Sequence, residues 1–301
     1  MLNRKLTRGR ALAWLGGVAS LTAVTLGLAV PGAASASSMP QTDWSYYVTS
    51  LNTSTAATLG CNQGKFDASH GNINSTATLD FGGQNSSNNG TILTFSGTQV
   101  SYSQVESYAE TFGYNYWLCT GADTTSYLTM SIGTNNSAYY VNSSGGASWA
   151  GVVNAVASYM NSYGQVTVWG ANDMELDWAS YSATSGWESG YAGHTSALYN
   201  DYGDAAGCPP YGSCDNGWTQ HDVYLVAWGD PPAEVTPEIY YTSQGNEWVS
   251  VSNTQGLISF WGPLDEYDLD SGTLTASQAW SALQCNGAQT CLFSLQIHKA
   301  S

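Results

Sequence analysis

Two acidic residues that stand two positions apart are the strongest candidates for chemistry in this sequence. Asp173 and Glu175 share one parity of the segment 166–177, whereas the opposite parity is mostly apolar. Because side chains alternate across a β-strand, both carboxylates would lie on one face, with Cα atoms about 6.6 Å apart at ~3.3 Å per residue. Paired carboxylates can divide acid and base roles, because different surroundings push their pKa values apart.

Two other predicted strands carry a polar group on the corresponding face, near the carboxyl end. Asp80 has this position in the segment 77–82, and Asn135 has it in the segment 127–135. Parallel strands bring their carboxyl ends to one edge, so both side chains are expected to meet the Asp-x-Glu pair there.

The Asp-x-Glu pair suits proton transfer. We assign Glu175 as the proton donor, because its longer side chain and a water-poor site favour a raised pKa. Asp173 would act as base or nucleophile, or would orient Glu175, and Asp80 on another strand is the alternative partner. Glycoside hydrolysis uses such a pair, at separations that differ between retention and inversion. We expect neither a metal ion nor a cofactor.

Two other interpretations of the acidic run stay open. It could be a solvated loop, since residues 177–185 are polar, or it could hold a calcium ion, which prefers clustered carboxylate oxygens. A second catalytic carboxylate could also come from Asp265, Glu266 or Asp268, although such a charged run is more typical of a solvated loop.

Aromatic side chains near predicted strand ends suit the C–H faces of sugars. Tyr240 shares its face with Glu238, in a segment read as a strand. The alternative for each ring is an ordinary core position. The expected substrate-binding residues are Asn135, Trp169, Trp228, Tyr240 and Trp261.

The charge balance excludes several classes of partner. Residues 1–36 combine a basic start, an apolar run and small residues, which is typical of a secretory signal peptide. The other 265 of the 301 residues hold 22 acidic residues against Lys65 and Lys299, a formal charge of −20. Nucleic acids and anionic membranes require basic residues, so a neutral or cationic partner remains, such as a polysaccharide or cell-wall glycan. We expect a secreted monomer.

The cysteines and other nucleophiles point to structure rather than catalysis. An even number of cysteines in a secreted chain indicates disulfides, and scattered histidines without a Cys-x-x-Cys motif argue against zinc. Ser148 lacks the second glycine of a nucleophile elbow, which argues against a serine hydrolase. The preferred pairs are Cys208 with Cys214, Cys285 with Cys291 and, by elimination, Cys61 with Cys119.

Strand-like and helix-like segments alternate along the chain, which predicts a parallel sheet and, at this length, a single-domain (β/α)8 barrel over residues 57–301. Residues 37–56 are expected to be an N-terminal lead-in. A doubly wound open sheet is the alternative fold. The expected helices are 103–117, 149–163, 187–199 and 277–283. The expected strands are 58–61, 77–82, 91–96, 127–133, 166–173, 222–228, 238–242, 257–261 and 292–297.

The segments 79–83 (LDFGG) and 169–175 (WGANDME), behind a secretion signal, resemble secreted bacterial barrel proteins described as glycoside-hydrolase-like. The Asp-x-Glu strand end is also similar to that of barrel-fold muramidases, which cleave the glycan strands of peptidoglycan. This resemblance implies a barrel fold and catalysis by Asp173 and Glu175. The chain departs from muramidases in having no Asp on a first strand near Cys61, where the next candidates are Asp67 and Asp80.

Three functions follow in order of preference. The first is a hydrolase of neutral or amino-sugar polysaccharide that works by paired carboxylates. The second is a non-catalytic carbohydrate- or cell-wall-binding barrel, and the third is an acid-adapted secreted peptidase. Only the first requires Asp173 and Glu175 for turnover.

Overall fold

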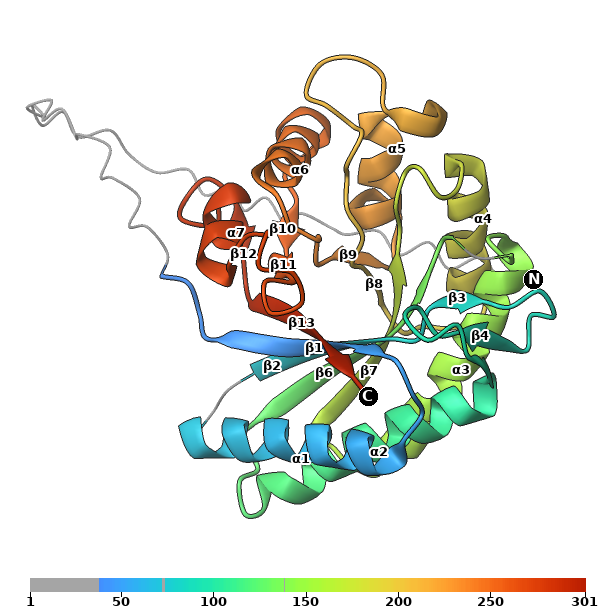
Figure 1. Ribbon diagram of the computed structural model, residues 1–301, viewed down its shortest axis with the longest axis vertical. Coiled ribbons are helices and arrows are strands. Elements are labelled where there is room, and N and C mark those ends of the chain that lie inside the picture. The colour runs from blue at the N-terminus through green and yellow to red at the C-terminus, as the bar shows by residue number, and fades with distance from the viewer. Residues whose placement is uncertain (1–37, 72–73, 138) are drawn as a thin grey trace, which may run out of the picture. The chain divides into compact units, whose positions relative to one another are not determined.

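Eight parallel strands form one curled, hydrogen-bonded sheet in the computed structural model, which describes residues 38–71, 74–137 and 139–301 (Figure 1). The strand order is β11-β13-β1-β2-β6-β7-β8-β9. The expected signal peptide, residues 1–36, lies outside the described residues. The strands are β1 (Thr42–Val48), β2 (Asn74–Asp80), β6 (Tyr127–Asn135), β7 (Val166–Asp173), β8 (Tyr199–Asp201), β9 (Ala233–Val235), β11 (Leu264–Asp265) and β13 (Ser294–Ala300).

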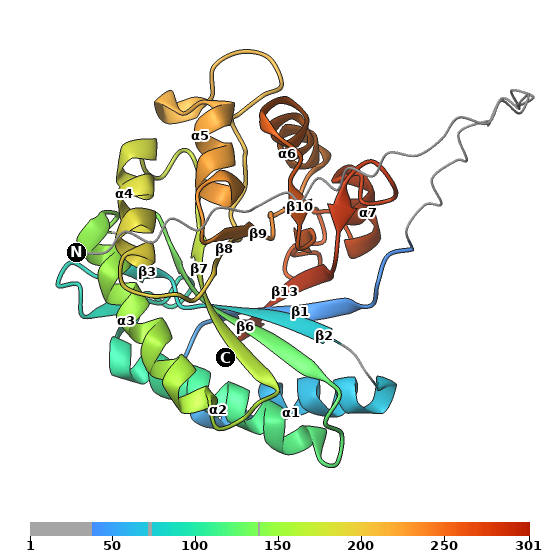
Figure 2. The same cartoon turned by 180° about the vertical axis from the view of Figure 1, so that it is seen from behind.

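Helices alternate with these strands and flank the sheet (Figures 1 and 2). Among the described residues, no helix combines the length and apolarity needed to cross a bilayer. The helices are α1 (Thr53–His70), α2 (Tyr102–Thr120), α3 (Ser143–Met160), α4 (Tyr181–Ala192), the short η1 (Asp215–Gly217), α5 (Gln220–Tyr224) continuing into the π-helical η2 (Leu225–Gly229), α6 (Thr242–Gln255) and α7 (Ala276–Ala282).

Two small sheets accompany the main one. An antiparallel sheet made of β3 (Gly83–Gln84), β4 (Gly90–Ile92) and β5 (Gln99–Ser101) follows directly after β2. A parallel pair joins β10 (Ser259–Phe260) to β12 (Thr290–Cys291).

The chain just after β9 lies against β11, which stands at the other end of the strand order. The Ile239 N–H donates to the Leu264 carbonyl (2.9 Å), and the Leu264 N–H donates to the Pro237 carbonyl (2.9 Å). These bonds flank a β-bridge between Glu238 and Leu264. The segment that carries Glu238 is therefore fixed by main-chain contacts on the β11 side.

Strand parity sorts the apolar side chains into two clusters. The larger cluster includes Leu79, Met130 and Trp149 and lies between the sheet and the helices. A separate, smaller cluster comes from the opposite parity and fills the inside of the curl. Its buried members are Tyr47, Ala171, Tyr202, Leu264, Leu295 and Ile297.

The prediction of a strand at residues 58–61 is wrong, because a helix cap precedes this segment. Residues 58–61 lie inside α1, and the Asn52 side chain accepts the Ser54 N–H at 3.0 Å to start that helix. Helix α1 therefore runs through the short apolar stretch that was expected to open the sheet.

A second expected strand, 222–228, is also helical. Thr219 and Asp222 form a capping box, in which each side chain accepts the other's main-chain N–H, and this starts α5. The helix then continues through η2. In the segment 238–242, only Glu238 makes a β-bridge before α6 begins.

The sheet also begins earlier in the chain than expected. The proposed lead-in, residues 37–56, contains β1, which pairs in parallel with β13 from Thr42↔Ser294 to Val48↔Ala300. The expected helix 187–199 ends earlier, because α4 stops at Ala192 and Tyr199 opens β8.

Three disulfides have the pairing that the spacing favoured. Cys61–Cys119 joins α1 to α2 across a sequence separation of 58 residues. Cys208–Cys214 and Cys285–Cys291 each close a loop with a separation of 6 residues.

Helices α1 and α2 also approach each other through glycine. A Cβ added at Gly60 would lie 2.1 Å from the Phe112 carbonyl oxygen, and one added at Gly64 would lie 2.3 Å from the Tyr116 carbonyl oxygen. Any side chain at these positions would force the two helices apart, so the close packing requires glycine.

We predict opposite effects of alanine at two helical glycines. Gly60→Ala should lower the free energy of unfolding by about 1–3 kcal/mol, because main-chain atoms of α2 cannot move aside for the new methyl group. Gly151→Ala, in α3, is the matched control, because nothing lies within 4 Å of its added Cβ. Alanine there should raise stability by up to ~1 kcal/mol. Urea unfolding followed by circular dichroism measures both, and equal effects would contradict the packing described.

Candidate active site

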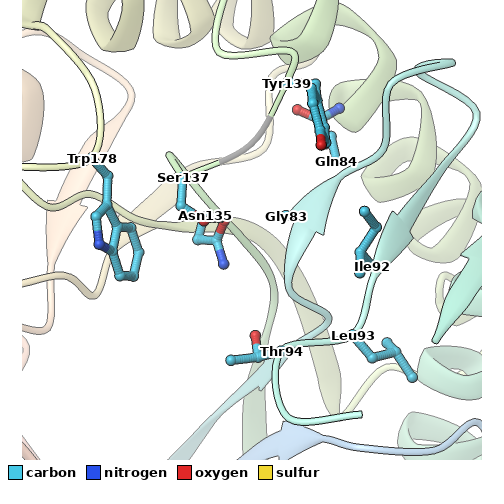
Figure 3. Close-up of a pocket in the computed structure, with 9 residues that line it drawn as sticks. All are labelled: Gly83, Gln84, Ile92, Leu93, Thr94, Asn135, Ser137, Tyr139 and Trp178. Carbon is cyan, nitrogen blue, oxygen red and sulfur yellow. Dashed lines mark hydrogen bonds between the residues drawn. The ribbon is translucent and has the colours of Figure 1, made fainter. Parts of the chain in front are cut away.

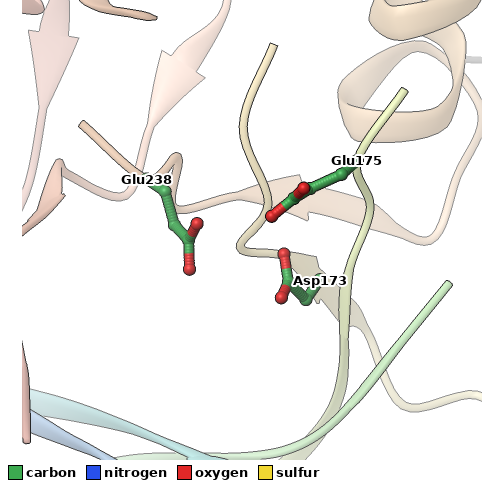
Figure 4. A group of neighbouring side chains, drawn as sticks. All are labelled: Asp173, Glu175 and Glu238. Atoms are coloured by element: carbon green, nitrogen blue, oxygen red, sulfur yellow. The ribbon is translucent and has the colours of Figure 1, made fainter. Parts of the chain in front are cut away.

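Three carboxylates from two separate segments point toward one space inside the sheet's curl (Figure 4). Asp173 ends β7, Glu175 follows it, and Glu238 comes just after β9. One oxygen from each carboxylate lies within 4.8 Å of the others. Asp173 and Glu238 are 5% and 2% exposed, whereas Glu175 is half-buried and is the member of the cluster most open to solvent.

Burial and mutual repulsion keep protons on this carboxylate cluster. Burial first, and then the charges of Asp204 and Asp177, raise the pKa of Glu175 to about 8. The pKa of Asp173 lies well above its usual range because of burial first, then the charges of Glu238 and Glu175. Three negative charges in so small a space would repel strongly, so the groups must share protons near neutral pH.

Tyrosine hydroxyls favour the ionised form of Glu238. The Tyr47 O–H, from β1, donates to Glu238 Oε1 at 3.2 Å, and the hydroxyls of Tyr47 and Tyr240 lie 3.0 Å apart. Burial, followed by the charge of Glu175, raises the pKa of Glu238 well above its usual range, and a hydrogen bond with Tyr240 acts in the opposite direction. The hydroxyl donors around Glu238 oppose this rise of its pKa without cancelling it.

Asp80 lies on the inward face, but both of its carboxylate oxygens already accept hydrogen bonds from neighbouring residues. Its Oδ1 accepts from the Gly82 N–H (3.0 Å) and the Tyr202 O–H (2.7 Å), and its Oδ2 accepts from the Thr94 hydroxyl (3.0 Å). It is 2% exposed and is not part of the carboxylate cluster. Burial raises its pKa, and these three hydrogen bonds lower it.

The structure places two of the expected substrate-binding residues beside the carboxylates. Tyr240 lies against Tyr47 and Glu238. Asn135 pairs in register with Asp173 across β6 and β7.

The three tryptophans lie elsewhere. Trp169 is on the inward face, but it precedes Asp173 by four residues, roughly 13 Å along a strand. It packs edge-to-face on Trp261 (4.4 Å between ring centroids), which stacks on Phe293. Trp228 lies in η2 rather than at a strand end and packs against the larger apolar cluster. These rings therefore serve packing in this structure.

Sequence reasoning missed the residue that completes the carboxylate cluster. Glu238 shares its parity with Tyr240, and that signal places it on the inward face of its segment. Tyr47 was missed because its strand was expected to be a lead-in. Asp204, which accepts from Gln244 Nε2 at 2.6 Å, follows a strand of only three residues.

The same three carboxylates, Asp173, Glu175 and Glu238, offer the oxygen ligands that a hard cation such as Mg²⁺ or Ca²⁺ prefers. Asp173 Oδ1 is buried and has no hydrogen-bond partner among the described residues. A proton or a cation at this oxygen would satisfy it. The geometry supports either acid–base chemistry or cation binding.

No protein-family model matches the chain, and no curated protein does. Among solved structures, a GH26 β-mannanase from Bacteroides ovatus, BoMan26A, is similar with a TM-score of 0.38 and 11% sequence identity. The match covers 82% of this chain and 86% of that chain. What this protein does has to be inferred from its own side chains.

We predict that the melting temperature falls as the pH rises from about 5 to 8. Glu188, in α4, is 3% exposed, and burial raises its pKa from 4.5 to about 9. Between those values the folded state keeps a proton that the unfolded chain has lost, so raising the pH favours unfolding. Glu175 adds to the same trend up to about pH 8.

Calorimetry across this pH range, on the parent protein and on Glu188→Gln, checks the expectation. The variant should show a shallower decline, because one of the retained protons is gone. A melting temperature that climbs steadily from pH 5 to pH 8 would show that these carboxyls ionise normally in the folded state.

Proposed function

We propose that this protein is a secreted glycoside hydrolase that cleaves a neutral or amino-sugar polysaccharide with retention of configuration. The observation that carries the proposal is the approach of Glu175 and Glu238, whose nearest oxygens lie within 4.8 Å of each other. Retaining glycosidases hold their two carboxyl groups about 5–5.5 Å apart, whereas inverting enzymes need about 6.5–9.5 Å to admit a water molecule.

The two carboxyls differ in exposure and in their hydrogen-bond partners. Glu175 is half-buried and has a pKa of about 8, so it carries a proton at neutral pH and can reach a bound substrate. It protonates the glycosidic oxygen as the bond to the anomeric carbon breaks. In the reactive state the protons of the cluster lie on Glu175 and Asp173, and Glu238 as a carboxylate, with Oε1 accepting from Tyr47, attacks that carbon and forms a glycosyl ester. Glu175 then takes a proton from water, which attacks the anomeric carbon, breaks its bond to the ester oxygen and releases Glu238 as a carboxylate.

Asp173 and Asp80 have supporting roles in this proposal. Asp173 lies between two acidic neighbours, and in its protonated form it can donate a hydrogen bond to one of them. Asp80 fixes Tyr202 and Thr94 at the same edge of the sheet. The nucleophile thus moves from Asp173, as the sequence suggested, to Glu238.

The proposal includes a closed (β/α)8 barrel. The main-chain bonds that join Pro237 and Ile239 to Leu264 support it, because they link the segment after β9 to β11. Closure of this kind would bring Glu238 opposite β7, with the carboxylates at the C-terminal mouth of the barrel, where barrel enzymes hold their chemistry.

We predict that Glu175→Gln and Glu238→Gln each lower kcat by about 10³-fold on a cleaved polysaccharide while the fold is kept. Glu188→Gln, a buried carboxyl on α4, is the control and should leave kcat unchanged. Proton NMR of the first product should show the retained anomer. Activity should fall above about pH 8, where Glu175 loses its proton.

Four results would contradict the assignment. Full turnover by both variants would remove the carboxylates from the chemistry, and an inverted product would exclude Glu238 as nucleophile. Loss of activity with EDTA, restored by Ca²⁺ or Mg²⁺, would favour the cation site. A protein that binds glycans but cleaves none would be the binding barrel instead.

A further inference from the structure

A pocket of about 280 Å³ lies between the β3–β4 hairpin and the chain segments that follow β6 and β7 (Figure 3). Trp178 lies at one end of the pocket in this view and Tyr139 at the other, with Asn135 and Ser137 between them. The side of the hairpin is formed by residues 92–94. A volume near the low end of the usual ~300–1,000 Å³ suits a single small ring.

The pocket adjoins the carboxylate cluster through three elements. Asn135 pairs in register with Asp173. Trp178 follows Glu175 by three residues. Thr94 donates to Asp80, which lies outside the cluster but whose charge raises the pKa of Asp173. A chain of sugar units with its scissile bond at Glu175 would therefore extend into this pocket.

The lining chemistry is uncharged and amphipathic. None of the nine lining residues is acidic or basic, although the sequence holds 22 acidic residues. Trp178 is 39% exposed and Tyr139 is 72% exposed, so both rings present apolar area to solvent. Exposed aromatic rings that lie next to a reaction site commonly mark a surface that a ligand covers.

The polar groups of the pocket differ in whether protein atoms already occupy their hydrogen-bonding capacity. Gln84 is buried, with Nε2 donating to Tyr102 (2.7 Å) and Oε1 accepting from Trp187 (2.8 Å), so it serves as structure. Asn135 Oδ1 accepts from the Ser137 hydroxyl (2.9 Å), which leaves the Asn135 amide nitrogen as a donor toward the pocket. Amide and hydroxyl groups of this kind match sugar hydroxyls.

We propose that this pocket is a sugar subsite next to the cleaved bond and that it takes an uncharged pyranose ring, which packs its C–H face on Trp178. The inference rests on the proposed function for its place in catalysis, but the pocket's choice of ligand follows from its own lining. Neutral hexoses and N-acetylated sugars fit it. Uronates and free-amine sugars would have to leave a charge without a partner there, which is costly.

The test measures binding in the absence of turnover. Calorimetric titration of full-length Glu175→Gln protein uses hexamers of cellulose, mannan, xylan and chitin as neutral probes. Hexamers of galacturonate and of fully deacetylated chitosan are the charged probes.

Trp178→Ala, added to the Glu175→Gln protein, should raise Kd for the neutral hexamer that binds best by about tenfold or more. Trp178→Phe should recover most of the affinity. Tyr211→Ala, at a ring that is 94% exposed and outside the pocket, should change nothing.

The subsite is overturned if no neutral hexamer binds saturably, if a charged hexamer binds more tightly than every neutral one, or if Trp178→Ala binds like its parent. Cleavage by the unmodified protein separates the two proposals. Binding that depends on Trp178 without any cleavage retains the subsite and removes the hydrolase. Cleavage that needs Glu175 but does not depend on Trp178 retains the hydrolase and removes the subsite.

Discussion

The placement of buried Asp173 and Glu238 beside half-buried Glu175, with one oxygen of each within 4.8 Å of the others, is the constraint on which the rest of the structure depends. Three ionised carboxylates could not share that space, so protons and hydroxyl donors must hold it together. Tyr47 provides such a donor from β1, while the acids come from β7 and from the chain after β9. The position of the carboxylate cluster thus links segments from the beginning, the middle and the later part of the chain.

The chain has few other means of neutralising buried acids. Beyond residue 36 it contains two lysines and no arginine, and Lys299 lies over the ring of Phe95 (3.8 Å to the centroid) rather than against a carboxylate of the cluster. A protein rich in basic residues could use ion pairs in its interior. Here, uncharged donors such as Tyr202 and Thr94 hold Asp80, whereas burial and the neighbouring acids raise the pKa values of the cluster.

The sequence predicted best where strands are long and two-faced. Alternation in β6 and β7 placed Asn135 and Asp173 on one face, and the register of the two strands sets them side by side. It failed where a cap decides the local structure, as at Thr219, which turns an apolar stretch that includes Trp228 into helix. Alternation with Tyr240 indicated the face of Glu238, but Glu238 follows a strand of only three residues, and the contact that fixes it comes from distant Leu264.

One feature of the sheet determines when such a site can exist at all. Strand β1, which contributes Tyr47, is paired along its length with β13, and these strands are separated by most of the chain. Contacts of such long range form slowly and cannot form while the C-terminal residues are still unmade. A partly synthesised chain would hold Tyr47 and the three acids but not β13, which pairs with β1 along its length, so the site would be assembled only once β13 has been made.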